Sequence, residues 1–140
     1  MDRVVRSISA GSPVSRVFRL WKNFELFPTF MQSVKSVENR GGGISHWVIR
    51  GPFGFRLQWD AVTTAVEENR LVAWQSIGGD LYTGGSAEFK ELAGGRTSVT
   101  VTLFYEIDAF ARNLATRLFN PGKRLEEDLE RFRVFAEQRG

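Results

Sequence analysis

Between residues 33 and 107 the sequence consists of segments with alternating apolar and polar residues, separated by short turns rich in glycine. The clearest alternation covers residues 97–107, where one face carries Val99, Val101, Leu103, Tyr105 and Ile107. Short connections of this kind join antiparallel strands, because a parallel pair needs a crossover of roughly a dozen residues or more. The pattern therefore predicts a mostly antiparallel sheet with one apolar face.

Six strands are predicted in this region. The triplet Gly41-Gly42-Gly43 ends the first strand, because glycine adopts turn conformations that bulky residues avoid. Glycine pairs at 78–79 and 84–85 bracket a segment that we expect to be short and irregular. The six predicted strands cover residues 33–39, 44–50, 55–63, 71–77, 86–92 and 97–107.

The N-terminal residues predict a strand followed by a helix. Residues 2–9 mix β-branched and polar residues, which is typical of a strand. Ser12 and Pro13 then supply an N-cap and a proline at the first helical position. Apolar residues at helical spacing predict a helix over 13–22.

An aromatic segment follows this helix. Residues 23–31 contain too many aromatic side chains for a solvated loop, and Pro28 discourages one continuous helix through them. We expect a second short helix or turn here, which lays Phe27, Phe30 and Met31 on the sheet.

The C-terminal residues return to the helical period. Apolar residues at 110, 114, 118 and 119 predict a lead-in helical piece, and Asn120-Pro121 repeats the cap and proline of the first helix. The long helix predicted from there to about Gln138 has one mainly apolar stripe. The stripe consists of Leu125, Asp128, Leu129, Phe132, Phe135 and Ala136. The acidic run at 126–128 is explained by its favourable interaction with the helix dipole.

These elements predict an α+β fold. The order is one strand, two short helices, six strands and a long helix, so the helices are the elements available to cover the apolar face of the sheet. We expect a curved antiparallel sheet of about seven strands around the long C-terminal helix. A chain of 140 residues has the common size of one domain, and we expect a single domain over residues 1–140.

Several strings along the chain carry a family resemblance. They include Val17-Phe18-Arg19-Leu20-Trp21, Phe27-Pro28-Thr29-Phe30-Met31, His46-Trp47, Gln58-Trp59-Asp60-Ala61 and Leu71-Val72-Ala73-Trp74-Gln75-Ser76. In this order they resemble the START-like (SRPBCC) superfamily of polyketide cyclases, coenzyme Q-binding proteins and birch-pollen-type plant allergens. The chain looks most similar to the small bacterial cyclase/dehydrase or coenzyme Q-binding members. The resemblance implies a helix-grip fold with a hydrophobic cavity between the sheet and the C-terminal helix.

Aromatic residues make up 13% of the chain, with twelve Phe and four Trp. Trp59 lies on the apolar face of its predicted strand, and we expect Trp47 and Trp74 on the same face. Large side chains of this kind either fill a core or line a cavity, and both interpretations stay open. The residues that we expect to bind a ligand are Trp47, Trp59, Trp74, Phe89, Tyr105, Phe27, Phe30, Met31 and Phe132.

Few polar side chains are candidates for catalysis. Tyr105 lies on the apolar face of its strand, where its hydroxyl would orient a ligand carbonyl, act as an acid, or reach water at the end of the sheet. Ser76, on the face of Trp74, is a weaker candidate. His46, Arg50 and Asp60 alternate outward, and we expect them to face solvent.

Several classes of site are not expected. The chain has no Cys, one His and no phosphate-binding loop or nucleophile elbow, so we expect no metal and no cofactor. The net charge of +3 is spread along the chain, and nucleic-acid proteins concentrate their basic residues on one face. No apolar run suits a signal peptide or approaches the ~20 residues of a membrane span. We expect a cytoplasmic protein, and its oligomeric state stays open.

Three functions remain. The first is binding of a small hydrophobic molecule, such as a polyketide, a quinone or a lipid, without catalysis. The second is an enzyme of the aromatase/cyclase or dehydrase type that uses the same cavity. The third is a protein-interaction domain, which needs an apolar patch on the outer face of the sheet, whereas the outer residues are largely Arg, Gln, Thr and Glu. The lack of a catalytic constellation favours the first.

Overall fold

The computed structural model describes residues 2–50, 56–106 and 121–138. Its strands are β1 (Asp2–Ala10), β2 (Val34–Gly41), β3 (Ile44–Arg50), β4 (Arg56–Glu67), β5 (Leu71–Gly79), β6 (Tyr82–Leu92) and β7 (Arg96–Glu106). Its helices are α1 (Val14–Lys22), the 3-10 helix η1 (Phe24–Thr29) and α3 (Pro121–Glu137). The predicted lead-in piece around 110–119 and the cap at Asn120 lie outside the described residues.

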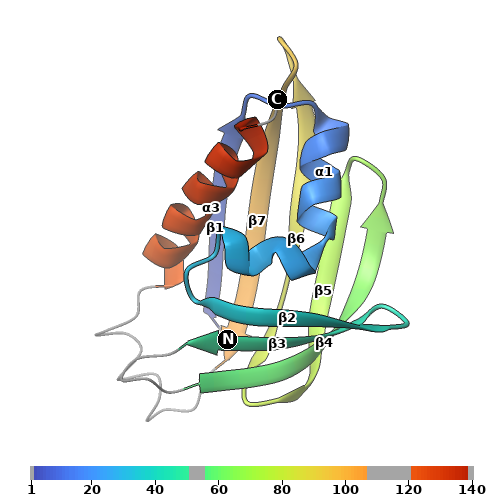
Figure 1. Ribbon diagram of the computed structural model, residues 1–140, viewed down its shortest axis with the longest axis vertical. Helices are drawn as coiled ribbons and strands as arrows, with labels where there is room; N and C mark the ends of the chain where they lie inside the picture. The colour runs from blue at the N-terminus through green and yellow to red at the C-terminus, as the bar shows by residue number, and fades with distance from the viewer. Residues whose placement is uncertain (1, 51–55, 107–120, 139–140) are drawn as a thin grey trace.

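The seven strands form one sheet in the order β1-β7-β6-β5-β4-β3-β2, and every neighbouring pair is antiparallel. Figure 1 shows α3 in front of the β1 end of the sheet and α1 in front of β5 and β6. The predicted α+β fold is therefore confirmed, with about seven strands, two short helices after β1, and a long C-terminal helix. The turn between β2 and β3 is also confirmed, with positive φ at Gly41, Gly42 and Gly43.

The alternation of side chains places the aromatic residues on the inner face. Trp47 and Trp59 pair directly across β3 and β4, and both are buried. Trp74 lies on β5 between buried Val72 and buried Ser76 in the alternation, so it shares their face. The prediction that all three tryptophans lie on the apolar, inner face of the sheet is confirmed.

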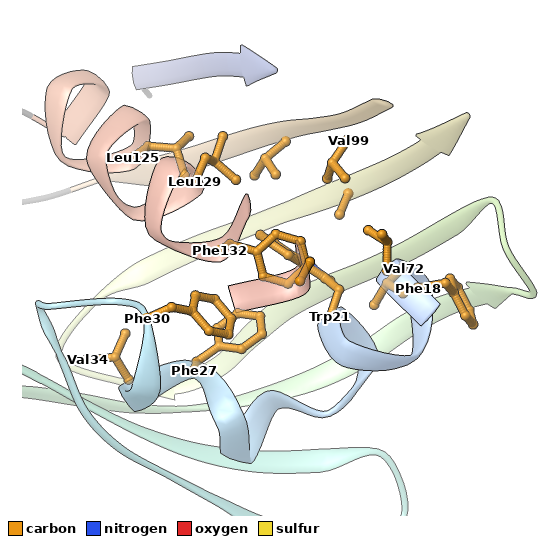
Figure 2. Close-up of a cluster of buried hydrophobic side chains, with 14 of the residues drawn as sticks. Phe18, Trp21, Phe27, Phe30, Val34, Val72, Val99, Leu125, Leu129 and Phe132 are labelled. Carbon is orange, nitrogen blue, oxygen red and sulfur yellow. The ribbon is translucent and has the colours of Figure 1, made fainter. Parts of the chain in front are cut away.

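Helix α3 packs on this inner face as predicted. Leu125, Leu129, Phe132 and Ala136 are all buried, and Figure 2 shows the first three of them pointing from the helix toward the strands and Trp21. The ring centroid of Phe132 lies 5.1 Å from that of Trp21 and 5.0 Å from that of Phe30. These side chains belong to the buried core between α3 and the sheet.

The prediction that Ser12 caps α1 is wrong. Pro13 occupies the N-cap position with extended backbone, and its carbonyl accepts hydrogen bonds from the N–H groups of Arg16 and Val17. Ser12 is buried, and its carbonyl accepts a hydrogen bond of 2.7 Å from the hydroxyl of Thr97 on β7. This contact fixes the chain against the sheet, so tertiary packing overrides the local capping signal.

The predicted irregular segment before residue 86 is also wrong, because β6 begins at Tyr82 and continues through both glycines. A Cβ atom on Gly85 would lie 2.4 Å from the carbonyl oxygen of Thr102 and 3.0 Å from the ring of Trp74. The glycine therefore allows Trp74 to approach the strand closely, and it is a packing feature rather than a break in the sheet. Strand β4 likewise extends beyond its prediction, to Glu67.

Asp128 links α3 to the segment before β2. Its carboxylate accepts hydrogen bonds from the backbone N–H of Gln32 at 3.2 Å and from Nη1 of Arg131 at 3.0 Å. Arg131 in turn donates to the side-chain oxygen of Gln32 at 3.2 Å. Since Asp128 is buried and lies two turns inside α3, the helix dipole does not explain it as predicted; its role is to join two elements.

Asp128→Asn is expected to change how stability depends on pH. Burial raises the pKa of Asp128 above its ordinary value of 3.8, so ionisation destabilises the folded state as pH rises from that value through the folded-state pKa. The asparagine keeps an acceptor for Gln32 and does not ionise. The melting temperature of the variant relative to the wild type should therefore rise between roughly pH 3.5 and pH 7.

Thermal melts over this pH range test the expectation, and a constant difference between the two proteins would contradict it. Asp128→Ala is the matched control. It does not ionise either, and it leaves the N–H of Gln32 without this acceptor, so it should follow the same pH trend as Asp128→Asn but lie about 1–3 kcal/mol below that variant in stability at every pH.

Candidate functional site

A cavity of about 540 Å³ lies between the α1–η1 segment and the inner side of strands β2 to β5. Its apolar walls come from Phe24, Val37, Ile44, Val66 and Val72. Glycines 41–43, in the turn between β2 and β3, form part of the rim without adding side chains. A volume of this size falls within the roughly 300–1,000 Å³ of small-molecule sites.

The position of η1 over β2 is fixed by Glu25. Its Oε2 accepts a hydrogen bond of 3.1 Å from the backbone N–H of Asn39, and the side-chain oxygen of Asn39 accepts one of 3.0 Å from the N–H of Gly41. All three residues line the cavity. These bonds hold the open side of the cavity in one geometry, because they join η1, the end of β2 and the turn.

Two basic residues stand at the same cavity. Arg19 and Lys22 belong to the last turn of α1, and both are exposed lining residues. Neither forms a hydrogen bond or an ion pair with any residue in the described part of the chain. The cavity therefore combines apolar walls with two available cations.

An aromatic cluster borders the cavity. We define it as Trp21, Phe24, Phe27, Phe30, Trp47, Trp59, Trp74 and Phe132, which contact one another through ring centroid distances of 5.0–6.5 Å. The ring of Phe24 lies 5.3 Å from Phe27, 5.5 Å from Trp47 and 6.1 Å from Trp74. Phe24 is thus both a wall of the cavity and a member of the cluster.

Polar groups within the cluster are few. The indole N–H of Trp47 donates to the hydroxyl of Ser45 at 2.8 Å, and Ser45 also lines the cavity. The indole nitrogen of Trp21 is buried and has no hydrogen-bond acceptor among the described residues. The cluster therefore presents aromatic surface with little hydrogen-bonding capacity.

The structure brings most of the predicted ligand-binding residues together, but not at the cavity. Trp47, Trp59, Trp74, Phe27, Phe30 and Phe132 all belong to the aromatic cluster. Met31 is half-buried and packs against the core, while Phe89 lies apart, with its ring 5.4 Å from that of Phe18. None of these residues, and no described residue of α3, lines the cavity of 540 Å³.

The two predicted polar candidates also lie elsewhere. The hydroxyl of Ser76 accepts a hydrogen bond of 3.0 Å from the backbone N–H of Thr83, and it extends the pairing of β5 with β6. Tyr105 is half-buried on β7 and pairs with Asp2 on β1 and with Thr83 on β6. Neither residue is among those that line the cavity.

His46 points to the outer face of the sheet, opposite to Trp47, as predicted. It is nevertheless not fully solvated, because its side chain is only 21% exposed. Its Nδ1 lies 2.7 Å from Oδ1 of Asp60, and its Nε2 lies 3.1 Å from Oε1 of Gln58. The three side chains form a polar link between β3 and β4.

The outer face is less polar than the sequence predicts. Val5, Ile77, Tyr82 and Phe104 are exposed there, on β1, β5, β6 and β7. The guanidinium of Arg3 lies over the ring of Phe104, 5.8 Å from its centroid. These four strands are consecutive in the sheet, and the register places Phe104 diagonally next to Val5 on β1 and to Tyr82 on β6, so these residues are neighbours on the outer face.

Sequence reasoning missed the residues that line the cavity. Arg19, Lys22 and Phe24 are in or beside strings that carried the family resemblance, but they were not singled out. One signal was available: two cations a turn apart at the end of an amphipathic helix, directly before an aromatic segment. The resemblance implies a cavity between the sheet and the C-terminal helix, whereas these three residues lie at the end of α1 and the start of η1.

Two classes of feature are absent from the described ranges 2–50, 56–106 and 121–138. No group of three or more His, Cys, Asp or Glu side chains is arranged to hold a metal ion there. No helix in these ranges is both long enough and apolar enough to cross a membrane.

The sequence profile of the family described as "Polyketide cyclase / dehydrase and lipid transport" matches residues 11–132. An uncharacterized 17.2 kDa protein of Streptomyces lincolnensis is 32% identical over 140 residues, which cover 100% of this chain and 93% of that protein.

Solved structures of similar proteins share the fold. A protein of Deinococcus radiodurans is 27% identical, with a TM-score of 0.77 over 97% of this chain and 98% of that chain. The Zhui aromatase/cyclase from a Streptomyces species has a TM-score of 0.79 over 99% of this chain and 94% of that chain. Since that enzyme is only 15% identical, the likeness extends to the fold alone.

Proposed function

The chain belongs to the family of polyketide cyclases, dehydrases and lipid-transport proteins, and from this premise we propose that it binds a small hydrophobic molecule of polyketide, quinone or lipid type. The observation that carries the proposal is the cavity of about 540 Å³ with its five apolar wall residues. Transfer of apolar ligand surface into such a site supplies roughly 25 cal/mol per Å² before the costs of ordering.

The ligand would lie against Phe24, with the aromatic cluster directly behind that ring. Trp47 and Trp74 contact Phe24, so the predicted ligand-binding tryptophans support the wall of the cavity in this proposal. In this proposal the tryptophans act on the ligand indirectly, because the ring of Phe24 lies between them and the ligand.

A cyclase-type activity in the same cavity is the alternative. It needs a side chain that moves protons next to the ligand. Tyr105 and Ser76, which the sequence favours for that role, are not among the cavity residues, and the hydroxyl of Ser76 is engaged with Thr83. The geometry therefore supports binding rather than catalysis as the proposal.

Titration with Nile red, an uncharged apolar fluorophore, is expected to quench tryptophan emission saturably. The reason is that Trp47 and Trp74 each contact the Phe24 wall, so a dye in the cavity lies close to two of the four tryptophans. Intrinsic emission at constant protein concentration gives the curve and its midpoint. A linear, non-saturating loss of emission would instead indicate unspecific association, and the proposal would then fail.

A further inference from the structure

Arg19 and Lys22 at the cavity restrict the chemical class of the ligand more than the apolar walls of the cavity do. We propose that the ligand is an amphiphile with an anionic head group, a carboxylate or a phosphate, which Arg19 and Lys22 bind at the mouth of the cavity. Its apolar part lies against Phe24, Val37 and Val72. This inference rests on the proposed function and names the chemical class of the ligand for the same site.

The first step of the argument is the placement of the two cations. Arg19 and Lys22 are three residues apart in α1, so their side chains emerge on the same side of the helix. The opposite side carries the buried residues Val17, Phe18 and Trp21. The fold thus anchors the helix by its apolar side and directs both cations to the cavity.

The second step is the lack of partners. Some arginines of the described chain form ion pairs, for example Arg6 with Glu126, whereas exposed cations such as Arg56 and Lys90 have no such pair with a described residue, so the lack of a partner counts only together with a position at the cavity. Arg19 and Lys22 have no such pair with any described residue. Their donors are therefore available to an anion, and guanidinium and ammonium groups are the usual partners of carboxylates and phosphates.

The third step is the charge balance of the lining. Glu25 is the one carboxylate among the described lining residues, and its Oε2 is engaged with the backbone of Asn39. The lining therefore has two cations against one carboxylate that already accepts a hydrogen bond. An uncharged ligand would leave the cations without any role in binding, whereas an anionic head group would neutralise them.

A simpler explanation of the cations exists. Positive charge in the last turn of a helix is favourable to the helix dipole and stabilises many surface helices. That explanation predicts an effect on stability but no preference among ligand head groups. The experiment must therefore measure head-group preference.

Displacement of Nile red by four dodecyl compounds, each kept below the concentration at which it aggregates, measures this preference. Dodecanoate and dodecyl phosphate carry the proposed anions, methyl dodecanoate is uncharged, and dodecyltrimethylammonium is cationic. The anions should displace the dye at roughly 3- to 30-fold lower concentration than the ester, with the cation weakest. The order of dodecanoate and dodecyl phosphate then assigns the head group as a carboxylate or a phosphate.

Variants connect the preference to the two residues. Arg19→Gln and Lys22→Gln should each reduce the advantage of the anions over the ester by about 2- to 5-fold and leave the affinity for the ester unchanged. Arg56→Gln and Lys90→Gln are the matched controls, because they remove the same charges from exposed positions outside the cavity. The controls should keep the full preference.

Two results would overturn the inference while the proposed function stands: equal displacement by dodecanoate and methyl dodecanoate, or a preference for anions that survives in the Arg19→Gln/Lys22→Gln double variant. If Nile red does not bind saturably in the first place, the proposed function itself fails. A fall in melting temperature without a change in head-group preference would support the helix-dipole explanation and count against the inference.

Discussion

Phe132→Ala is expected to lower the free energy of unfolding by about 3–5 kcal/mol, the usual cost of removing a large aromatic side chain from a core. Phe132 is 0% exposed, and its ring contacts Trp21 on one side and Phe30 on the other. Its removal leaves a void among three elements, since α1, the segment after η1 and α3 all meet at this ring. Denaturation with urea at constant pH measures the change.

Val134→Ala is the control on the same helix. Val134 is 44% exposed, so its truncation should change stability by no more than about 0.5 kcal/mol. If Phe132→Ala were as mild as this control, the described interior beneath α3 would not be packed as the structure indicates. A ligand cavity under α3 would then become the better explanation of the aromatic residues.

The sheet was predictable because its determinants are local. Alternation over residues such as Leu57, Trp59 and Ala61 decides which face is apolar, and the Gly41-Gly42-Gly43 turn decides that consecutive strands are antiparallel. Each signal lies within one strand or one turn, so neighbouring residues suffice to interpret it.

Two predictions from local signals were wrong because contacts with residues distant in sequence determine the structure there. Ser12 does not cap α1, because Thr97, distant in sequence, binds its carbonyl and fixes the chain differently. The pair Gly84-Gly85 does not interrupt β6, because Trp74 from the neighbouring strand packs over it. Serine is typical of a helix cap and a glycine pair is typical of a break in a strand. In both cases a contact with another strand decides the local structure instead.

The cavity was not predictable from the sequence because its position depends on which side chains fill the interior. The rings of Phe27, Phe30 and Phe132 pack together and occupy the space near α3. The cavity of about 540 Å³ lies at the C-terminal end of α1, next to Phe24. Alternation assigns a residue to the inner face, but it does not tell a filled region from an empty one.

Val66→Trp is expected to weaken binding of Nile red by at least about tenfold, which corresponds to roughly 1.4 kcal/mol. Val66 lines the cavity and pairs with buried Val72 across β4 and β5, so an indole at this position occupies the volume that the ligand needs. The residue is 45% exposed, and tryptophan is well tolerated in strands, so the fold should be retained.

The ratio of Nile red affinities between Val66→Trp and Val134→Trp is the measurement that tests the central claim most directly. Both valines are exposed to the same degree, 45% and 44%, but only Val66 lines the cavity. Both variants add the same indole, and excitation of the bound dye itself keeps the extra tryptophan from changing the readout. A ligand site between α1–η1 and the sheet predicts a dissociation constant at least about tenfold higher for Val66→Trp, with Val134→Trp at the wild-type value. Equal affinities in two variants that remain folded would contradict it, because the dye would then bind somewhere other than this cavity.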